Sequence, residues 1–277
     1  MCTIPVLRAV CRESYNQPPA VYEKLKRLGM DLVTITDHDS IDAVEALRSR
    51  PDFFLSEEVS CTLPSGTDLH VGVYDIQDRD HVEIQRRRGD FESLSAYLAE
   101  RRLFFSANHV FSSLTGRRAV EDFALFEQAF PALETRNGHM LALANNHAAR
   151  LADFTGRAEV GGSDAHVMAS VGCAYTVVPG ARTRQEYLEG LRRGHGKVRG
   201  ETGNYWKLTR DVLSIGRGMV RENPFTLPIA ALGALVPLVI VGNYMMEGVF
   251  ARYWMDRYLR ARELRDQDRA AVAEVAA

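Results

Sequence analysis

The sequence predicts an α/β fold built around a parallel sheet, and two patterns support this prediction. Short apolar, β-branched runs alternate with helix-periodic segments along most of the chain, which is typical of parallel strands covered by helices. Several of these runs end in histidine or carboxylate residues, and ligands gather at the carboxyl ends of parallel strands. The clearest example is 31–40, DLVTITDHDS, in which a strand-like run is followed by Asp37, His38 and Asp39.

Helix and strand signals then succeed one another as far as residue 194. Prolines at the start and Gly29 at the end mark the first helix, and the turn-forming PSGTD at 64–68 separates two strands. Helices are predicted at 18–29, 40–49, 80–102, 119–129, 139–154 and 183–194. Strands are predicted at 31–36, 53–60, 70–76 and 103–107, near Glu134, within 156–166 and at 177–178.

Composition bounds the class of protein without identifying it. The 277 residues are 46% hydrophobic and 25% charged, which suits one α/β barrel domain with an appendage or two small domains. A net charge of −2 gives no general attraction for nucleic acid. The four cysteines form no C-x-x-C pair, and the first residues lack the apolar core of a secretory signal, so we expect a cytoplasmic protein.

The region 204–277 is predicted to be a separate helical part with an apolar segment. No charged residue occurs from 223 to 246, and segment 224–246 is long enough to be a membrane-spanning candidate. Arginines flank it on both sides, so a hairpin bent at Pro237 with both ends on the cytoplasmic face would satisfy both flanks. The alternative is a buried helix pair that packs on the barrel or on a second subunit of a homo-oligomer.

Four of the eight histidines lie at or beside strand-like runs, namely His38, His70, His109 and His166. Carboxylates lie close to three of them: Asp37 precedes His38, Glu57 and Glu58 end the strand before His70, and Asp164 lies near His166. Imidazoles with a carboxylate that can bridge two ions are the ligands of a hydrolytic metal centre. The other histidines, at 81, 139, 147 and 195, are interpreted as structural or solvent-facing.

These motifs, in this order, resemble the PHP (polymerase and histidinol phosphatase) family. The matching motifs are TDHDS at 36–40, EEVS at 57–60, DLHVGVYD at 68–75, SANHVF at 106–111 and GSDAH at 162–166. The resemblance covers about residues 12–200. It implies a distorted (β/α)7 barrel over 1–203 that uses one to three divalent ions, of zinc, manganese or iron, to hydrolyse phosphoesters.

The resemblance also implies roles for individual residues. Six residues would bind the ions: His38, Glu58, His70, His109, Asp164 and His166. Glu58 would bridge two of the ions, and His109 or His166 could pass a proton to the leaving group. We therefore expect the catalytic residues to be Glu58, His109 and His166.

One feature of the family is missing from this sequence. The family opens with a strand that carries an H-x-H pair, and this chain has no histidine before His38. Ligands of two of the three ions are therefore absent, and so is the barrel's first strand. A reading frame that starts too late would explain this, and so would loss of a metal site.

The predicted function is metal-dependent hydrolysis of a phosphoester in a small molecule or a nucleotide. Arg136, or the arginines at 86–88, could hold a second phosphate of the substrate. A second hypothesis is a non-catalytic, membrane-associated metal-binding domain that has lost part of its site. A third is an amidohydrolase, against which the D-x-H pair at 164–166 argues. The sequence identifies neither the substrate nor the metal.

Overall fold

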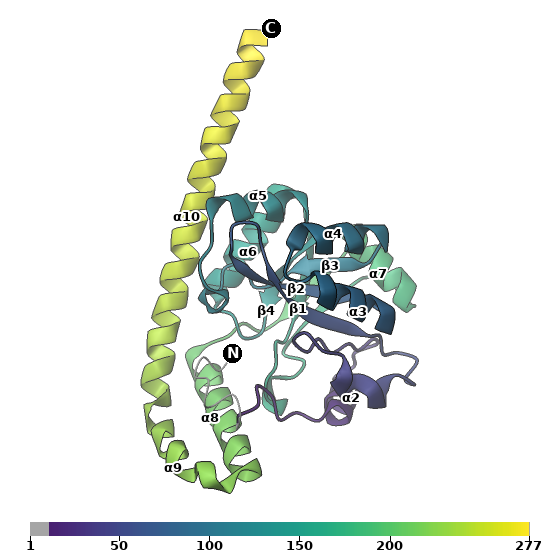
Figure 1. The fold of residues 1–277 in the computed structure, drawn as a ribbon, viewed down its shortest axis with the longest axis vertical. Helices are drawn as coiled ribbons and strands as arrows, with labels where there is room; N and C mark the ends of the chain where they lie inside the picture. Colours follow the sequence, from purple (N-terminus) through teal and green to yellow (C-terminus); the bar gives the residue numbers. More distant parts are fainter. Residues whose placement is uncertain (1–10, 277) are drawn as a thin grey trace.

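The computed structural model describes residues 11–276, and it consists of an α/β domain followed by a long helical extension (Figure 1). The α/β class predicted from the sequence is thereby confirmed. Five strands make the main sheet, in the order in which they occur in the chain: β1 (Ser56–Thr62), β2 (Asp68–Tyr74), β3 (Phe104–Ala107), β4 (Ala132–Asn137) and β5 (Ala158–Gly162).

The main sheet is mixed, so the prediction of a parallel sheet is right only for part of it. β1 and β2 pair antiparallel through the short turn 63–67, and β2 and β3 also pair antiparallel, although two α-helices lie between them. One α-helix connects β3 to β4 and another connects β4 to β5, and those pairs are parallel. Two further strands, β6 (Ala174–Val177) and β7 (Lys197–Gly200), form a separate antiparallel pair. The strands that the structure describes are therefore not hydrogen-bonded into one closed ring.

The segment 31–36 does not form the regular strand that its β-branched residues predict. It is joined to the main sheet by isolated parallel bridges, Val33 to Phe53 and His38 to Glu58. The physical reason is that this segment has hydrogen-bond partners on one side only within the described residues. The bridge at His38 still fixes its position beside β1, since Glu58 N donates to Asp37 O and Asp39 N donates to Glu58 O.

The helices lie largely where the sequence predicts them, with two differences. The predicted helix 80–102 is split in two, because Gly89 interrupts it and the Asp90 carboxylate caps the second part by accepting from the amides of Glu92 and Ser93. The predicted helix 40–49 is a short 3-10 helix, Asp42–Leu47. The α-helices of the domain are α2 (Pro18–Arg27), α3 (Asp78–Arg87), α4 (Phe91–Glu100), α5 (Val120–Gln128), α6 (Ala142–Thr155) and α7 (Arg184–Arg192).

The C-terminal extension is a helical hairpin. Helix α8 (Tyr205–Glu222) runs away from the domain, the chain turns through the short α9 (Leu227–Ala230), and α10 (Val236–Ala276) runs back along the domain and beyond it (Figure 1). Residues Pro224–Asp268 form the one stretch of helix that is long and apolar enough to cross a membrane in the part of the chain that the structure describes.

Two parts of α10 differ in their surroundings. Ala251, Met255 and Tyr258 are buried in the main hydrophobic core, against residues such as Phe123 of α5. By contrast, the most apolar 18-residue window of the stretch is only 11% buried. The predicted apolar segment 224–246 is thus mostly exposed and does not form a helix pair buried on the domain, whereas the part of α10 that follows it packs on the domain.

Candidate metal centre

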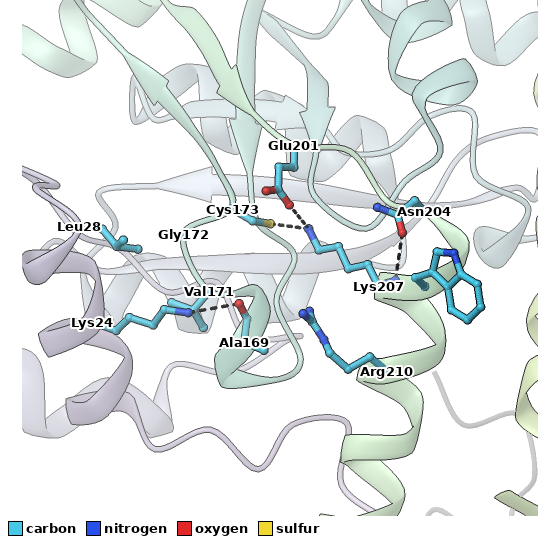
Figure 2. A pocket seen from close by; sticks show the side chains of 11 residues that line it. Lys24, Leu28, Ala169, Val171, Gly172, Cys173, Glu201, Asn204, Lys207 and Arg210 are labelled. Atoms are coloured by element: carbon cyan, nitrogen blue, oxygen red, sulfur yellow. Dashed lines mark hydrogen bonds and ion pairs between the residues drawn. The ribbon is translucent and has the colours of Figure 1, made fainter.

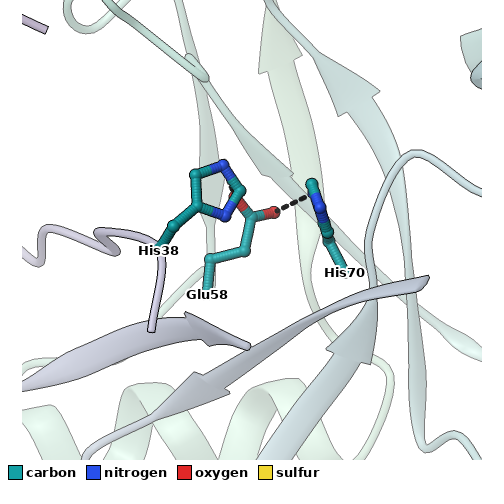
Figure 3. A group of neighbouring side chains, drawn as sticks. All are labelled: His38, Glu58 and His70. Carbon is teal, nitrogen blue, oxygen red and sulfur yellow. Dashed lines mark ion pairs between the residues drawn. The ribbon is translucent and has the colours of Figure 1, made fainter. Parts of the chain in front are cut away.

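Glu58 lies at the centre of a cluster of three histidines, which we call the Glu58 cluster: His38, Glu58, His70 and His109. The carboxylate of Glu58 projects from β1 between His38 and His70 (Figure 3). Its Oε2 atom is 3.5 Å from His38 Nε2, whereas its Oε1 atom is 3.4 Å from His109 Nε2 and 3.8 Å from His70 Nδ1. The two oxygens thus face different histidines, as the oxygens of a carboxylate that bridges two ions do.

These distances suit divalent ions. Four ligands that surround an ion tetrahedrally at about 2.1 Å lie roughly 3.4 Å from one another. The donor atoms of His38, Glu58 and His70 all lie within 4.8 Å of one another, and no protein atom bonds the buried Nδ1 atoms of His38 and His109. The residues of the Glu58 cluster therefore fit a metal ion of the kind that imidazole and carboxylate prefer.

The strands position this cluster through their register. His70 pairs with Ser60 and Gly72 pairs with Glu58 across the β1–β2 ladder. A Cβ atom at Gly72 would lie 3.1 Å from Asn108 Oδ1, and Asn108 donates to Glu58 Oε1 at 2.8 Å. A glycine at this position therefore leaves room for the amide that orients Glu58.

In the metal-free protein, the ionisable groups of the Glu58 cluster shift one another's pKa values. Burial opposes ionisation of Glu58, but the three histidines outweigh it and hold the pKa of this carboxyl far below its usual range. Burial also lowers the pKa of His109, but a hydrogen bond and the charge of Glu58 outweigh it and raise the pKa to about 9. Burial lowers the pKa of His70 to about 4, so a neutral His70 accepts at Nδ1 from His109 Nε2, 3.2 Å away.

A second cluster lies just beyond the ends of β4 and β5 and comprises His139, Asp164 and His166, which we call the Asp164 cluster. Their donor atoms all lie within 4.8 Å of one another, and the rings of His139 and His166 stack with centroids 5.5 Å apart. His139 was expected to be structural or solvent-facing, and the structure instead places it beside two predicted ligands. The expectation that it has no carboxylate partner is wrong, because its Nε2 lies 2.9 Å from Asp211 Oδ2.

Polar side chains at the end of β4 connect the two clusters. Asn137 Nδ2 donates to Glu134 Oε2 at 3.0 Å and to Asp164 Oδ2 at 3.1 Å. The same oxygen of Glu134 accepts from the backbone amide of His109 at 3.0 Å. Burial raises the pKa of Glu134 to about 7.

Sequence reasoning missed three residues of this region: Glu13, Glu134 and His139. The Glu13 carboxylate lies 4.0 Å from His38 Nε2, although Glu13 belongs to no strand and no motif. The sequence could have indicated Glu134, because it is a carboxylate near the end of a predicted strand. The structure shows that it is buried. The other carboxylate of the EEVS motif, Glu57, points away from the cluster to His81 Nδ1, 2.8 Å distant.

Backbone conformation is unusual at both clusters. Five non-glycine residues have positive φ in the described part of the chain, and two of them are His109 (31°) and Asp164 (46°). A third, Asp39 (54°), immediately follows His38, and its carboxylate is held by Ser60 N and Arg88. Such strain costs of order 1–3 kcal/mol per residue and is found at sites where function requires the conformation.

The fold and these two clusters define a class, an α/β protein with two neighbouring groups of histidines and carboxylates that could hold metal ions. Residues 142–195 match a family model described as PHP-associated. This match includes one of the five motifs, GSDAH at 162–166, and agrees with the resemblance to the PHP family. No curated protein matches the sequence.

Several solved structures are similar to this chain at low sequence identity, and one of them, PsfC, has a TM-score above 0.5. PsfC from Pseudomonas syringae is 17% identical, with a TM-score of 0.54 over 75% of this chain and 93% of PsfC. A proposed metal-dependent phosphoesterase from Bifidobacterium adolescentis is 13% identical (TM-score 0.46; 66% of this chain, 92% of that one). The lesion-specific endonuclease EndoQ from Pyrococcus furiosus is 15% identical (TM-score 0.48; 68% of this chain, 55% of that one).

Proposed function

We propose that this protein is a metal-dependent hydrolase that cleaves a phosphoester bond. The observation that carries the proposal is the position of Glu58, whose two oxygens face different imidazoles at 3.4–3.8 Å. His38, Glu58, His70 and His109 would hold metal in the first cluster, and His139, Asp164 and His166 in the second. Divalent ions bound there supply Lewis acidity and an activated water.

The protein's own groups would then bind and orient the reactants. Asn108 holds Glu58 Oε1, and Asn137 holds Glu134 and Asp164, so the carboxylates keep one orientation. Where Asp164 and His139 alone hold the second ion, His166 is a candidate to donate a proton to the leaving alkoxide, because its side chain is 29% exposed while that of His109 is only 7% exposed. Of the two roles predicted for His109, we therefore favour that of a metal ligand over that of a proton donor.

Turnover of p-nitrophenyl phosphate with and without added manganese or zinc tests this function. We expect metal-dependent release of p-nitrophenol that EDTA abolishes and added metal restores. Equal rates with and without metal would contradict the proposal. Tight binding of metal without any hydrolysis of mono- or diesters would favour the alternative of a non-catalytic metal-binding domain.

We further propose that the tip of the C-terminal hairpin, residues 224–246, inserts into one leaflet of a membrane. The apolar side chains of this tip are exposed around most of the helix: Phe225 is 71% exposed, Leu238 70% and Met245 66%. A soluble helix that packs on one partner shows a single apolar stripe, whereas a helix that is apolar on nearly all sides suits lipid. Arg217 and Arg221, on the neighbouring α8, could reach anionic headgroups.

Two features argue against a span across the bilayer. Glu247 is fixed to the domain, since it accepts from Ser113 N at 3.0 Å and from Ser113 Oγ at 2.6 Å. Only 236–246 of α10 then extends below the domain, about 16 Å of helix at 1.5 Å per residue, against about 30 Å of hydrocarbon. The charged end of α8 also packs beside this part of α10, which limits the depth of insertion.

Flotation with vesicles that contain phosphatidylglycerol tests this attachment. We expect the protein to float with the vesicles and Leu238→Asp to reduce the bound fraction strongly, because a carboxylate would enter the hydrocarbon. Leu264→Asp is the matched control, since Leu264 is a 62% exposed leucine on the same helix outside the tip. Equal flotation of both variants would contradict the proposal, as would a stable dimer that buries the tip and leaves no vesicle binding.

A further inference from the structure

A pocket of about 540 Å³ lies beyond the Asp164 cluster, and the mechanism proposed above does not use it (Figure 2). Three parts of the chain line it: α2, the loop 169–173, and the segment from Glu201 into the first turns of α8. Its charged side chains are three cations, Lys24, Lys207 and Arg210, and one carboxylate, Glu201. The pocket is therefore predominantly cationic.

Lys207 is the most unusual of these side chains because it is buried and its ion pair, with Glu201, is longer than a hydrogen bond. Only 6% of its side chain is exposed, and its Nζ donates to Cys173 Sγ at 2.9 Å. The nearest carboxylate oxygen, Glu201 Oε2, is 3.6 Å away on a side chain that is 71% exposed (Figure 2). Burying an ammonium group is costly unless an anion compensates it, and a solvent-exposed glutamate beyond hydrogen-bond distance does so only weakly.

The other groups around the pocket could complete an anion site. Arg210 donates from Nε to Asp211 Oδ1 and from Nη2 to Ser170 Oγ. Its side chain is 51% exposed. Asn204 caps the 18-residue helix α8 by accepting from Lys207 N, so the positive end of the helix dipole also lies at the pocket. An oxyanion here would meet an ammonium, a guanidinium and a helix N-terminus together, which is the set of groups that binds phosphate.

The pocket shares a wall with the Asp164 cluster. Asp211 Oδ2 accepts from His139 Nε2 at 2.9 Å and also from Ser170 Oγ, while its Oδ1 accepts from Arg210. Cys173, which contacts Lys207, also lies 3.9 Å from the carbonyl oxygen of Ser163, next to Asp164. A ligand in the pocket would thus be one side chain away from the residues that would hold metal.

We propose that this pocket binds a phosphate group other than the one that is hydrolysed. The proposal rests on the proposed function for the position of the scissile phosphate, and it assigns the substrate to a class, compounds with two phosphate groups. None of the arginines predicted from the sequence, Arg136 and those at 86–88, lines this pocket. Arg86 and Arg87 pair with Glu83, and Arg88 pairs with Asp39, away from the Asp164 cluster.

Binding of inorganic phosphate to the protein in EDTA tests the site independently of catalysis. Isothermal titration calorimetry should detect one phosphate, and Lys207→Met and Arg210→Gln should each weaken its affinity by at least about 10-fold, the effect of losing one charged hydrogen bond. Lys197→Met, an exposed lysine on β7 outside the pocket, should bind as the unmodified protein does. Glu58→Gln should also retain phosphate binding, because it alters only the other cluster.

The results separate the two proposals from each other. Unchanged phosphate affinity in both Lys207→Met and Arg210→Gln, with a folded protein by circular dichroism, would overturn the pocket assignment whether or not the protein is an enzyme. Loss of phosphate binding in Glu58→Gln would overturn it too, since the phosphate would then occupy the metal centre. Arg210→Gln, whose side chain is half exposed, keeps the test valid if the buried Lys207→Met does not fold.

Kinetic measurements show whether the pocket binds a second phosphate group of the substrate or a free phosphate ion that regulates the enzyme. With alkanediol bisphosphates of three to six carbons and the matching monophosphates, the preference in kcat/KM for the bisphosphate should fall by about 10-fold in Arg210→Gln. An undiminished preference would exclude the assigned substrate class. Activity that instead changes with added inorganic phosphate, at a constant preference, would identify the pocket as a regulatory anion site and overturn the substrate assignment.

Discussion

The Glu58 cluster and the Asp164 cluster use the same kinds of side chain in different surroundings. Glu58 and His109 are each 9% exposed, and the cluster's charges are balanced internally by one carboxylate among three imidazoles. In the Asp164 cluster the Asp164 and His166 side chains are 24% and 29% exposed, and Asp211 connects His139 to the cationic pocket. Under the proposed function both clusters hold metal, and this difference leads us to expect the substrate to reach the centre from the side of the Asp164 cluster.

Loss of the Glu58 carboxylate should have the largest effect. Glu58→Gln replaces the carboxylate that faces His38 with one oxygen and His70 and His109 with the other, so we expect metal-dependent turnover to fall by more than about 100-fold. Glu57→Gln is the matched control, because the adjacent carboxylate bonds His81 and Gln85 on the other side of β1. Similar losses in the two variants would show that Glu58 acts through the fold and does not hold metal.

Removal of an imidazole from the Asp164 cluster should have the next largest effect. His139→Ala should lower turnover by about 10- to 100-fold, since it deprives Asp164 and His166 of their partner. His147→Ala, on helix α6, should remain near the unmodified rate because His147 packs against Phe111 and belongs to neither cluster. A His139→Ala variant with full activity would return this histidine to a structural role.

In the metal-free protein, His109 of the Glu58 cluster should carry a proton that it loses when metal binds. The raised pKa of His109, about 9, means that its stabilising charge is fully present below pH 6.5 and is lost as the pH rises through 9. Metal binding at pH 8 should therefore release a proton from His109, because a ligating imidazole is neutral. Calorimetry of zinc binding in buffers of different ionisation enthalpy measures this release, and His109→Ala should abolish it.

The smallest effect is expected for Asp211, which positions His139. Burial raises the pKa of this carboxyl, but bonds from His139, Ser170 and Arg210 outweigh it and lower the pKa to about 2. Asp211→Asn should reduce kcat a few-fold and leave binding of metal by the Glu58 cluster intact. Its contribution to stability is present above pH 4 and is lost as the pH falls through 2, so the variant should show a shallower acid denaturation.

Sequence reasoning identified the buried cluster better than the exposed one. His38, Glu58, His70 and His109 lie in strand-end motifs, where local sequence already indicates position, and the structure brings them together. His139 and Asp211 lie 72 residues apart and meet because the start of α8 packs back against the loop between β4 and α6. The pairing of Glu13 with His38 and the mixed direction of the sheet likewise depend on tertiary contacts that no local pattern encodes.

An anomalous difference map from crystals grown with manganese tests the central claim most directly. We expect one peak bonded to Glu58, His70 and His109 and a second peak bonded to Asp164 together with His139 or His166. Manganese found only at surface carboxylates, with the Glu58 cluster empty in a folded protein, would contradict the account.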